Sequence, residues 1–149
     1  MDKITKALIN HKEVLGIFDS LYEHLSSVSV DKSPEYIKKL HGLLHRDIAI
    51  HFKFEEEQIF AAIKGVGGQE TEKMVNGLLN EHKAIINKIK EFEDESVKAG
   101  PPWNADKLRE ISELGRNIID MITVHARRED EEFFPLVKKL NVQFNNNDK

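Results

Sequence analysis

The sequence predicts an all-α protein, an up-down-up-down bundle of four helices within one domain. A chain of 149 residues, 40% of them hydrophobic, is long enough to bury one sizeable core. Breaks rich in glycine, proline or serine separate four long segments. In each segment apolar residues recur at spacings of three and four, which is the period of one helix face. Together these observations favour helices packed side by side.

Capping and turn residues mark the segment boundaries. Ser33 before Pro34 predicts an N-cap followed by proline at the first helical position. Stretch 65–68 is glycine-rich, stretch 100–102 reads Gly-Pro-Pro, and Asn104 then caps the next helix. The predicted helices therefore cover residues 3–26, 34–64, 69–98 and 104–140. Short connectors between them make successive helices antiparallel.

Each predicted helix carries one stripe of core positions. The first stripe contains Ile4, Leu8, His11, Leu15, Phe18, Tyr22 and Leu25. The second contains Ile37, His41, Leu44, Ile48, His51 and Glu55. The third contains Val75, Leu78, His82, Ile85, Ile89 and Phe92. The fourth contains Ile111, Gly115, Ile118, Ile122, His125, Glu129 and Leu136, and Pro135 is expected to kink or end that helix.

Composition excludes several classes of protein. The absence of cysteine excludes disulfides, thiolate zinc sites, iron–sulfur ligation and cysteine nucleophiles. A net charge of −4 gives no reason to expect nucleic acid or an anionic membrane as partner. No apolar run approaches the roughly 20 residues of a membrane span, and no signal sequence is evident, so a cytoplasmic protein is expected. The bundle is expected over residues 1–140, followed by a polar tail at 141–149.

Polar residues on the core stripes are the unusual feature of this sequence. Five of the seven histidines fall on a stripe; four of these five, one per predicted helix, lie near one level, and a glutamate follows two of these four by four residues. These six residues are His11, His51, Glu55, His82, His125 and Glu129. A residue and its i+4 neighbour share a helix face, so each His/Glu pair can address one point. Counting from the connectors places all four histidines near one layer, with a mismatch of about 7 Å between the third and fourth helices.

A metal centre explains these residues better than structural roles do. One core histidine is more often a satisfied polar residue, and one glutamate on a stripe is more often a boundary residue. Four imidazoles and two carboxylates buried together without partners would cost several kcal/mol per charge. A metal ion reverses that cost, because neutral histidine and ionised glutamate are its ligands.

The ligand count predicts two metal ions. Glu55 and Glu129 would bridge them; His11 with His51 would complete one ion, and His82 with His125 the other. A bridging oxide or hydroxide gives five ligands and leaves one open position per ion. Mixed nitrogen and oxygen ligation of this kind suits two iron ions, with manganese or zinc as substitutes. The ferritin-like diiron pattern, Glu-x-x-His, does not occur at any histidine here.

Other polar residues are expected to lie outside this centre. His41 and His45, spaced i,i+4, could hold a metal on one face, but they and His24 are interpreted as surface or boundary histidines. The acidic residues next to the bridging carboxylates are expected to face solvent. They are Glu56, Glu57, Asp130, Glu131 and Glu132.

The motifs together resemble the hemerythrin-like, or HHE cation-binding, family. The matching elements are His11, HFKFEEEQIF at 51–60, the EHK around His82 and HARREDEEFFP at 125–135. The resemblance covers nearly the whole chain. It implies a non-haem diiron site that binds dioxygen, nitric oxide or a related small oxidant.

Two positions depart from the oxygen-carrying members. Those proteins have a fifth histidine four residues after the histidine of the third helix, where this chain has Ile86. They also use His-x-x-x-x-Asp on the fourth helix, whereas this chain has His125 with Glu129 at i+4. The four-His, two-Glu set looks more like the branch associated with nitric oxide, iron–sulfur repair, or iron and oxygen sensing.

The sequence therefore predicts a protein that binds, stores or senses O2 or NO, rather than an enzyme. The alternative is a diiron enzyme or iron donor in peroxide or NO detoxification or in iron–sulfur cluster repair. A third interpretation is a purely structural bundle. Apolar side chains around the site are expected to keep water out of it. They are Leu15, Ile48, Leu78, Ile85, Ile86, Ile118 and Ile122.

Overall fold

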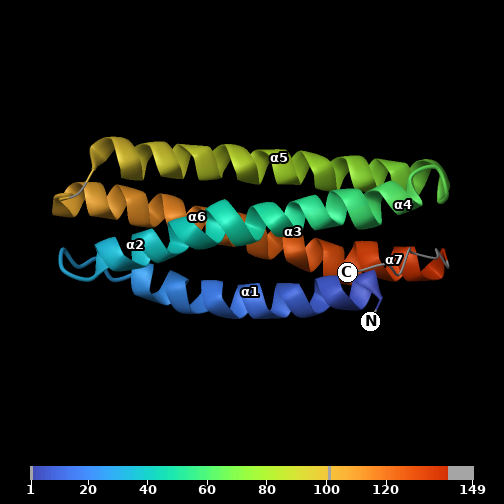
Figure 1. The fold of residues 1–149 in the computed structure, drawn as a ribbon, viewed down its shortest axis with the longest axis horizontal. Helices are drawn as coiled ribbons and strands as arrows, with labels where there is room; N and C mark the ends of the chain where they lie inside the picture. Colours follow the sequence, from blue (N-terminus) through green and yellow to red (C-terminus); the bar gives the residue numbers. More distant parts are fainter. Residues whose placement is uncertain (1, 101, 141–149) are drawn as a thin grey trace.

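Four long helical rods lie side by side in the computed structural model, which describes residues 2–100 and 102–140 (Figure 1). The first rod is α1 (Lys3–Leu25), and the third is α5 (Gly68–Ala99). The second is continuous through α2 (Ser33–Gly42), η1 (Leu43–Ile48), α3 (Ala49–Phe54), η2 (Glu55–Phe60) and α4 (Ala61–Ile63). The fourth joins α6 (Ala105–Arg128), η3 (Glu129–Phe133) and α7 (Phe134–Lys139). The segments η1, η2 and η3 are π-helical.

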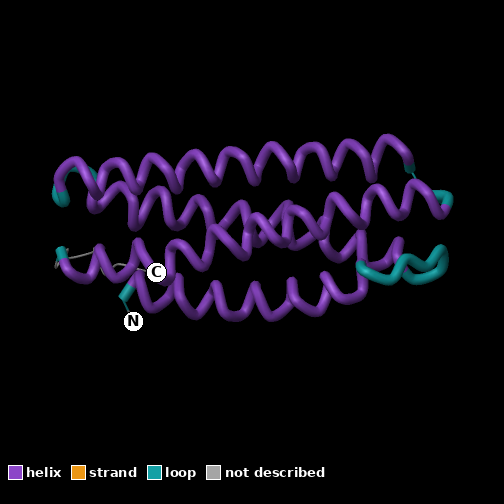
Figure 2. The backbone as a smooth tube through the Cα atoms, turned by 180° about the vertical axis from the view of Figure 1, so that it is seen from behind, coloured by secondary structure: helices purple, strands orange, loops and turns teal. Residues whose placement is uncertain are grey.

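The predicted all-α four-helix bundle is thus confirmed. Viewed from behind, the described residues form only helices and the short loops that join them at the two ends of the bundle (Figure 2). None of the helices in residues 2–100 and 102–140 is both long enough and apolar enough to cross a membrane. The predicted division between bundle and tail stays a prediction, because residues 141–149 lie outside the described part.

Local sequence explains where the rods begin and end. The side chain of Asn104 accepts a hydrogen bond from the backbone N–H of Lys107 at 2.8 Å, which is the predicted N-cap of α6. Ser33 behaves differently from its predicted cap role: it is the first residue of α2, and its hydroxyl accepts from the N–H of Ser29. Gly65, with φ of 81°, allows the chain to turn after α4 in a conformation that other residues rarely adopt.

The apolar core consists of two clusters at opposite ends of the bundle. The larger one contains Phe18, Leu25, Leu40, Phe92 and Ile111, among other buried residues. The smaller one contains Ile4, Ala7, Ile59, Phe133 and Val137, among others. Along α1, buried His11 lies between the two clusters, in the layer where the polar candidates were expected.

Candidate metal centre

All six candidate ligands are buried and converge from the four rods. The exposed fraction of the residue is 5% for His11, 8% for His51, 2% for His82 and 3% for His125, and it is 0% for both glutamates. The histidines come from α1, α3, α5 and α6, while Glu55 and Glu129 are the first residues of η2 and η3. The structure brings together every residue that the sequence analysis selected for this site.

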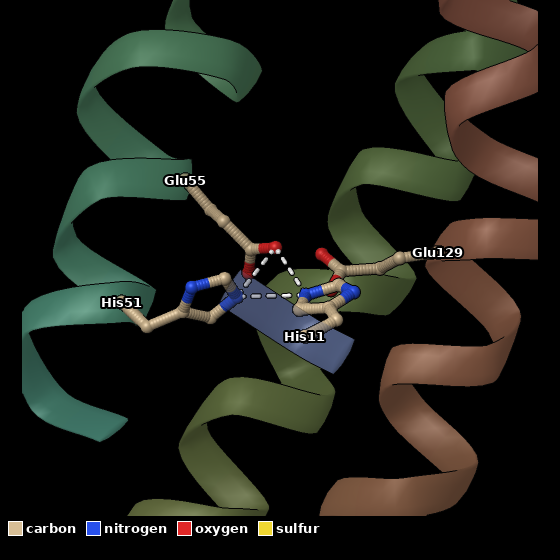
Figure 3. A group of neighbouring side chains, drawn as sticks. All are labelled: His11, His51, Glu55 and Glu129. Atoms are coloured by element: carbon tan, nitrogen blue, oxygen red, sulfur yellow. Dashed lines mark hydrogen bonds and ion pairs between the residues drawn. The ribbon is translucent and has the colours of Figure 1, made fainter. Parts of the chain in front are cut away.

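One half of the centre contains His11 and His51 (Figure 3). Their Nε2 atoms lie 2.8 Å apart. Oε2 of Glu55 lies 3.0 Å from Nε2 of His51 and 3.3 Å from Nε2 of His11. Oε1 of Glu129 also lies 3.3 Å from Nε2 of His11. Two imidazole nitrogens and two carboxylate oxygens therefore surround one point.

The other half contains His82 and His125, whose Nε2 atoms lie 3.0 Å apart. Oε1 of Glu55 lies 3.1 Å from Nε2 of His82, and Oε1 of Glu129 lies 3.4 Å from Nε2 of His125. Glu55 thus turns one oxygen toward each half, whereas Oε1 of Glu129 is close to a histidine of both. Within each half the four donor atoms all lie within 4.8 Å of one another. This is the arrangement of two sites that share two carboxylates.

Outer carboxylates orient three of the four histidines. Nδ1 of His11 lies 2.8 Å from Oδ1 of Asp130. Nδ1 of His82 lies 2.7 Å from Oε2 of Glu56, and Nδ1 of His125 lies 2.7 Å from Oε1 of Glu81. An ionised carboxylate only accepts hydrogen bonds, so in each pair Nδ1–H donates and Nε2 faces the centre, where the neutral ring would offer its lone pair to a metal ion.

The inner atoms of the centre fit a pair of metal ions. Oε2 of Glu55 and both carboxylate oxygens of Glu129 are buried without a hydrogen-bond partner. Nitrogen lone pairs and carboxylate oxygens that face each other in this way repel, and each buried unpaired group costs roughly 1–3 kcal/mol. A cation between them removes both costs, because neutral imidazole and ionised carboxylate are its ligands. Borderline nitrogen and hard oxygen donors together suit iron or manganese.

In the metal-free protein, protons balance the charge of these groups. Burial alone would lower the pKa of His11, but hydrogen bonds to carboxylates, chiefly that of Asp130, raise it to about 11. Burial disfavours the charge of Glu55, yet hydrogen bonds from histidines hold its pKa well below the usual range. Burial and the nearby charge of Glu55 raise the pKa of Glu129 well above its usual range. Burial lowers the pKa of His125.

The π-helical segments position the two shared carboxylates. Both η2 and η3 start at the shared glutamate, at Glu55 and Glu129 respectively. A π-helical turn carries an extra residue and re-aims the side chains around it, and such turns are frequent at functional sites. Contrary to the expected end or kink at Pro135, the helical path continues through it, because proline is tolerated in the first turn of α7.

Aromatic rings cover the centre, where the sequence analysis expected aliphatic side chains. The ring of Phe52 stacks on His82 with centroids 3.9 Å apart and an interplanar angle of 7°. Phe60 also stacks on His82, at 5.6 Å, and Phe134 stacks on His11, at 5.8 Å. Stacking restrains the imidazoles in addition to the hydrogen bonds at Nδ1.

A small cavity of about 10 Å³ adjoins the histidines. Its lining is Asn10, His11, Val14, Leu15, Ile48, His51, Phe52, Ile122, His125 and Ala126. Leu15, Ile48 and Ile122 were expected around the site. Ile86 instead packs against the larger apolar cluster from a partly buried position. The volume is that of about one water-sized molecule.

A surface groove of about 380 Å³ leads toward this cavity. Its lining is Lys6, Ala7, Asn10, Glu13, Val14, Ile17, Asp47, Ile50, His51 and Phe54. Asn10, Val14 and His51 line both spaces. His51 is also the most exposed of the four histidines, so the groove approaches the centre on its side.

Three carboxylates were missed or misassigned by the sequence analysis. Glu56 and Asp130 were expected to face solvent, and Glu56 is exposed as expected, but each also holds a histidine of the centre; Glu81 was not considered at all. The sequence feature that could have identified them is their position, because each is next to a core-stripe residue in the sequence. Glu57, Glu131 and Glu132 are exposed as expected.

The spacing of Asp130 also raises the question of which carboxylate is central. Asp130 follows His125 by five residues, which is the spacing that the oxygen-carrying proteins use, whereas Glu129 follows it by four. The side chain of Glu129 is 0% exposed and lies inside the centre; that of Asp130 is 31% exposed and contacts the outer nitrogen of His11. The structure thus favours Glu129 as the shared carboxylate.

Comparison with known proteins gives one family. No curated protein and no solved structure matches the chain. The family model described as Hemerythrin HHE cation binding domain matches residues 8–137. This range contains all six residues of the centre and most of every rod. The chain therefore belongs to the hemerythrin HHE cation-binding family, a family of metal-binding domains that typically hold iron.

Proposed function

We propose that this chain holds two iron ions and uses them to bind, store or sense a small diatomic ligand, O2 or NO. The observation that carries the proposal is the direct contact between a centre with two shared carboxylates and a small cavity of about 10 Å³. A cavity with room for one water-sized molecule admits a diatomic and excludes larger substrates.

The proposed ligand set follows the two halves of the centre. His11 and His51 would hold one ion, His82 and His125 the other, and Glu55 and Glu129 both. When bound, the irons would supply redox-active sites with open coordination positions. Asp130, Glu56 and Glu81 keep three of the imidazoles oriented with Nε2 inward, where it can bind a metal ion.

The residues around the cavity select for a small uncharged ligand. Val14, Leu15, Ile48, Phe52 and Ile122 give the cavity an apolar wall. An apolar wall favours a neutral diatomic over water or an ion, because a charged or strongly polar molecule would lose its hydration there. The same wall withholds protons from the bound ligand, which favours reversible binding over reduction.

Metal analysis with optical spectroscopy tests the proposal. Iron-loaded protein is expected to contain two irons per chain. After anaerobic reduction, its spectrum should change on addition of O2 or NO and return when the gas is removed. Sustained consumption of NO or peroxide, or loss of iron to an acceptor, would instead support the enzyme or iron-donor alternative. Failure to retain iron, with unchanged thermal stability on chelation, would support a structural bundle.

A further inference from the structure

A second group of possible metal ligands lies on the surface of the bundle. Nδ1 of His45 lies 3.1 Å from Oε1 of Glu93, and Nε2 of His41 lies 3.6 Å from the same oxygen. His41 belongs to α2, His45 to η1 and Glu93 to α5, so two neighbouring rods contribute. The three donor atoms all lie within 4.8 Å of one another.

The geometry of the group is close to that of a metal site. His41 and His45 are spaced i,i+4, so they share one helix face, and their rings are nearly parallel, with an interplanar angle of 10° and centroids 5.6 Å apart. Ligands about 2.1 Å from a tetrahedral ion lie roughly 3.4 Å from one another. The two distances to Glu93 fall on either side of that value, so small side-chain rotations suffice.

We propose that His41, His45 and Glu93 form a second metal site, which binds one divalent ion of the zinc type. Two imidazoles and one carboxylate match the preferences of Zn²⁺, Ni²⁺ and Cu²⁺, whereas Mg²⁺ and Ca²⁺ require oxygen ligands. Three protein ligands leave at least one position for water. The site does not depend on the proposed iron centre, because the two share no residue.

The second site is accessible to solvent, and an ion bound there would connect two rods. The side chains of His41, His45 and Glu93 are 37%, 69% and 27% exposed. His41 also lines an open cavity of about 550 Å³ beside Trp103, through which an ion can reach it. His41 precedes His51 by ten residues, or about 15 Å along the rod. An ion there would link the second rod to α5 at a distance from the iron centre.

Zinc titration of the iron-loaded full-length chain tests the second site. Isothermal titration calorimetry is expected to show one Zn²⁺ bound per chain, with no release of iron and no binding of Mg²⁺. His45→Ala and Glu93→Gln should each weaken zinc binding at least about tenfold, because each removes a direct ligand. Zinc should also raise the melting temperature of the wild-type chain, and this increase should be lost in His45→Ala.

The chain offers a matched control in His24→Ala. His24 is an exposed histidine that stacks on Tyr36 with centroids 4.2 Å apart, away from Glu93. This variant should bind zinc as the wild type does. Three results would overturn the proposal: no zinc binding by the wild type, unchanged binding by His45→Ala, or binding that displaces iron in equal amount. Because the side chain of His45 is largely exposed, its replacement should leave the fold intact, and iron retention reports folding directly.

Discussion

Nε2 of His82 lies 3.0 Å from Nε2 of His125, although a carboxylate holds the opposite nitrogen of each ring. Glu56 and Glu81 each accept the Nδ1 proton, so both Nε2 atoms present lone pairs to one another. Two acceptors at this separation need a cation between them. We therefore expect the stability of the bundle to depend on a bound metal ion.

Removal of metal is expected to destabilise the chain. An ion that binds only the folded state stabilises it by about 4 kcal/mol when its free concentration is a thousand times its dissociation constant. Chelation of the iron-loaded protein should therefore lower the melting temperature by roughly 8–16 °C for each ion lost, because 1 kcal/mol corresponds to about 2–4 °C in a domain of about 150 residues. Calorimetry before and after chelation measures this, and restoration by added iron is the control. An unchanged melting temperature would contradict the metal assignment.

Glu129 and Asp130 are expected to differ in their effect on iron binding. Glu129→Gln replaces the shared carboxylate, close to both His11 and His125, by a neutral amide that is a much weaker metal ligand, so iron content should fall below two per chain. Asp130→Asn removes only the charge of the outer partner of His11, which should preserve two irons but weaken affinity about 10- to 100-fold. Iron analysis and chelator competition distinguish the two. Exposed Glu131→Gln is the control, and loss of iron in Asp130→Asn alone would reverse the assignment.

Iron binding is expected to release protons and to strengthen as pH rises. The folded-state pKa of His11 is raised from 6.5 to about 11, so without metal His11 carries an extra proton near neutral pH, and burial raises the pKa of Glu129 well above its usual range. His11 must lose this proton to bind an ion, so at least one proton should be released per chain on loading. Calorimetry in buffers of different ionisation enthalpy counts them.

The metal-free protein should show the opposite dependence on pH. A pKa that is higher in the folded than in the unfolded state contributes stability that is full below the unfolded value and is lost as pH rises through the folded one. The contribution of His11 is therefore present below pH 6.5 and decreases toward pH 11. Denaturant unfolding of the apoprotein at several pH values in this range measures the loss. Stability that rises with pH would contradict the assigned protonation of His11.

Most of the fold and the inner residues of the centre could be predicted because both depend on periodicity. Helical spacing alone put His51 and Glu55 on one face, and connectors near residues 26–32 and 64–67 fixed the antiparallel order. The observed helix boundaries also reduce the difference in height along the bundle that was expected between His82 and His125. His82 lies 17 residues before the end of α5, and His125 lies 20 residues after the start of α6.

The outer carboxylates, the aromatic stacking and the π-helical segments could not be predicted in the same way. They depend on contacts between rods, whereas periodicity describes one helix at a time. Glu81 reaches His125 across 44 positions in the sequence, and Asp130 reaches His11 across 119. The sequence shows that Phe52 is apolar, but its stacking on His82 depends on how two rods are oriented about their axes. The π-helical starts at Glu55 and Glu129 have no distinct sequence signal, because a π-helical turn arises when packing favours one extra residue in a helix.

Val14 is expected to control how fast a diatomic ligand reaches the centre. Val14 lines both the small cavity and the surface groove, whereas Ile17, about one turn further along α1, lines the groove but not the cavity. Val14→Phe should narrow the junction and slow O2 or NO association by about tenfold or more, while iron content stays at two per chain because Val14 contributes no ligand. Ile17→Phe adds similar bulk outside the junction and should leave the rate unchanged. Stopped-flow absorbance of the reduced proteins measures both rates, and equal rates in the two variants would mean that the ligand enters by a route other than the side of His51.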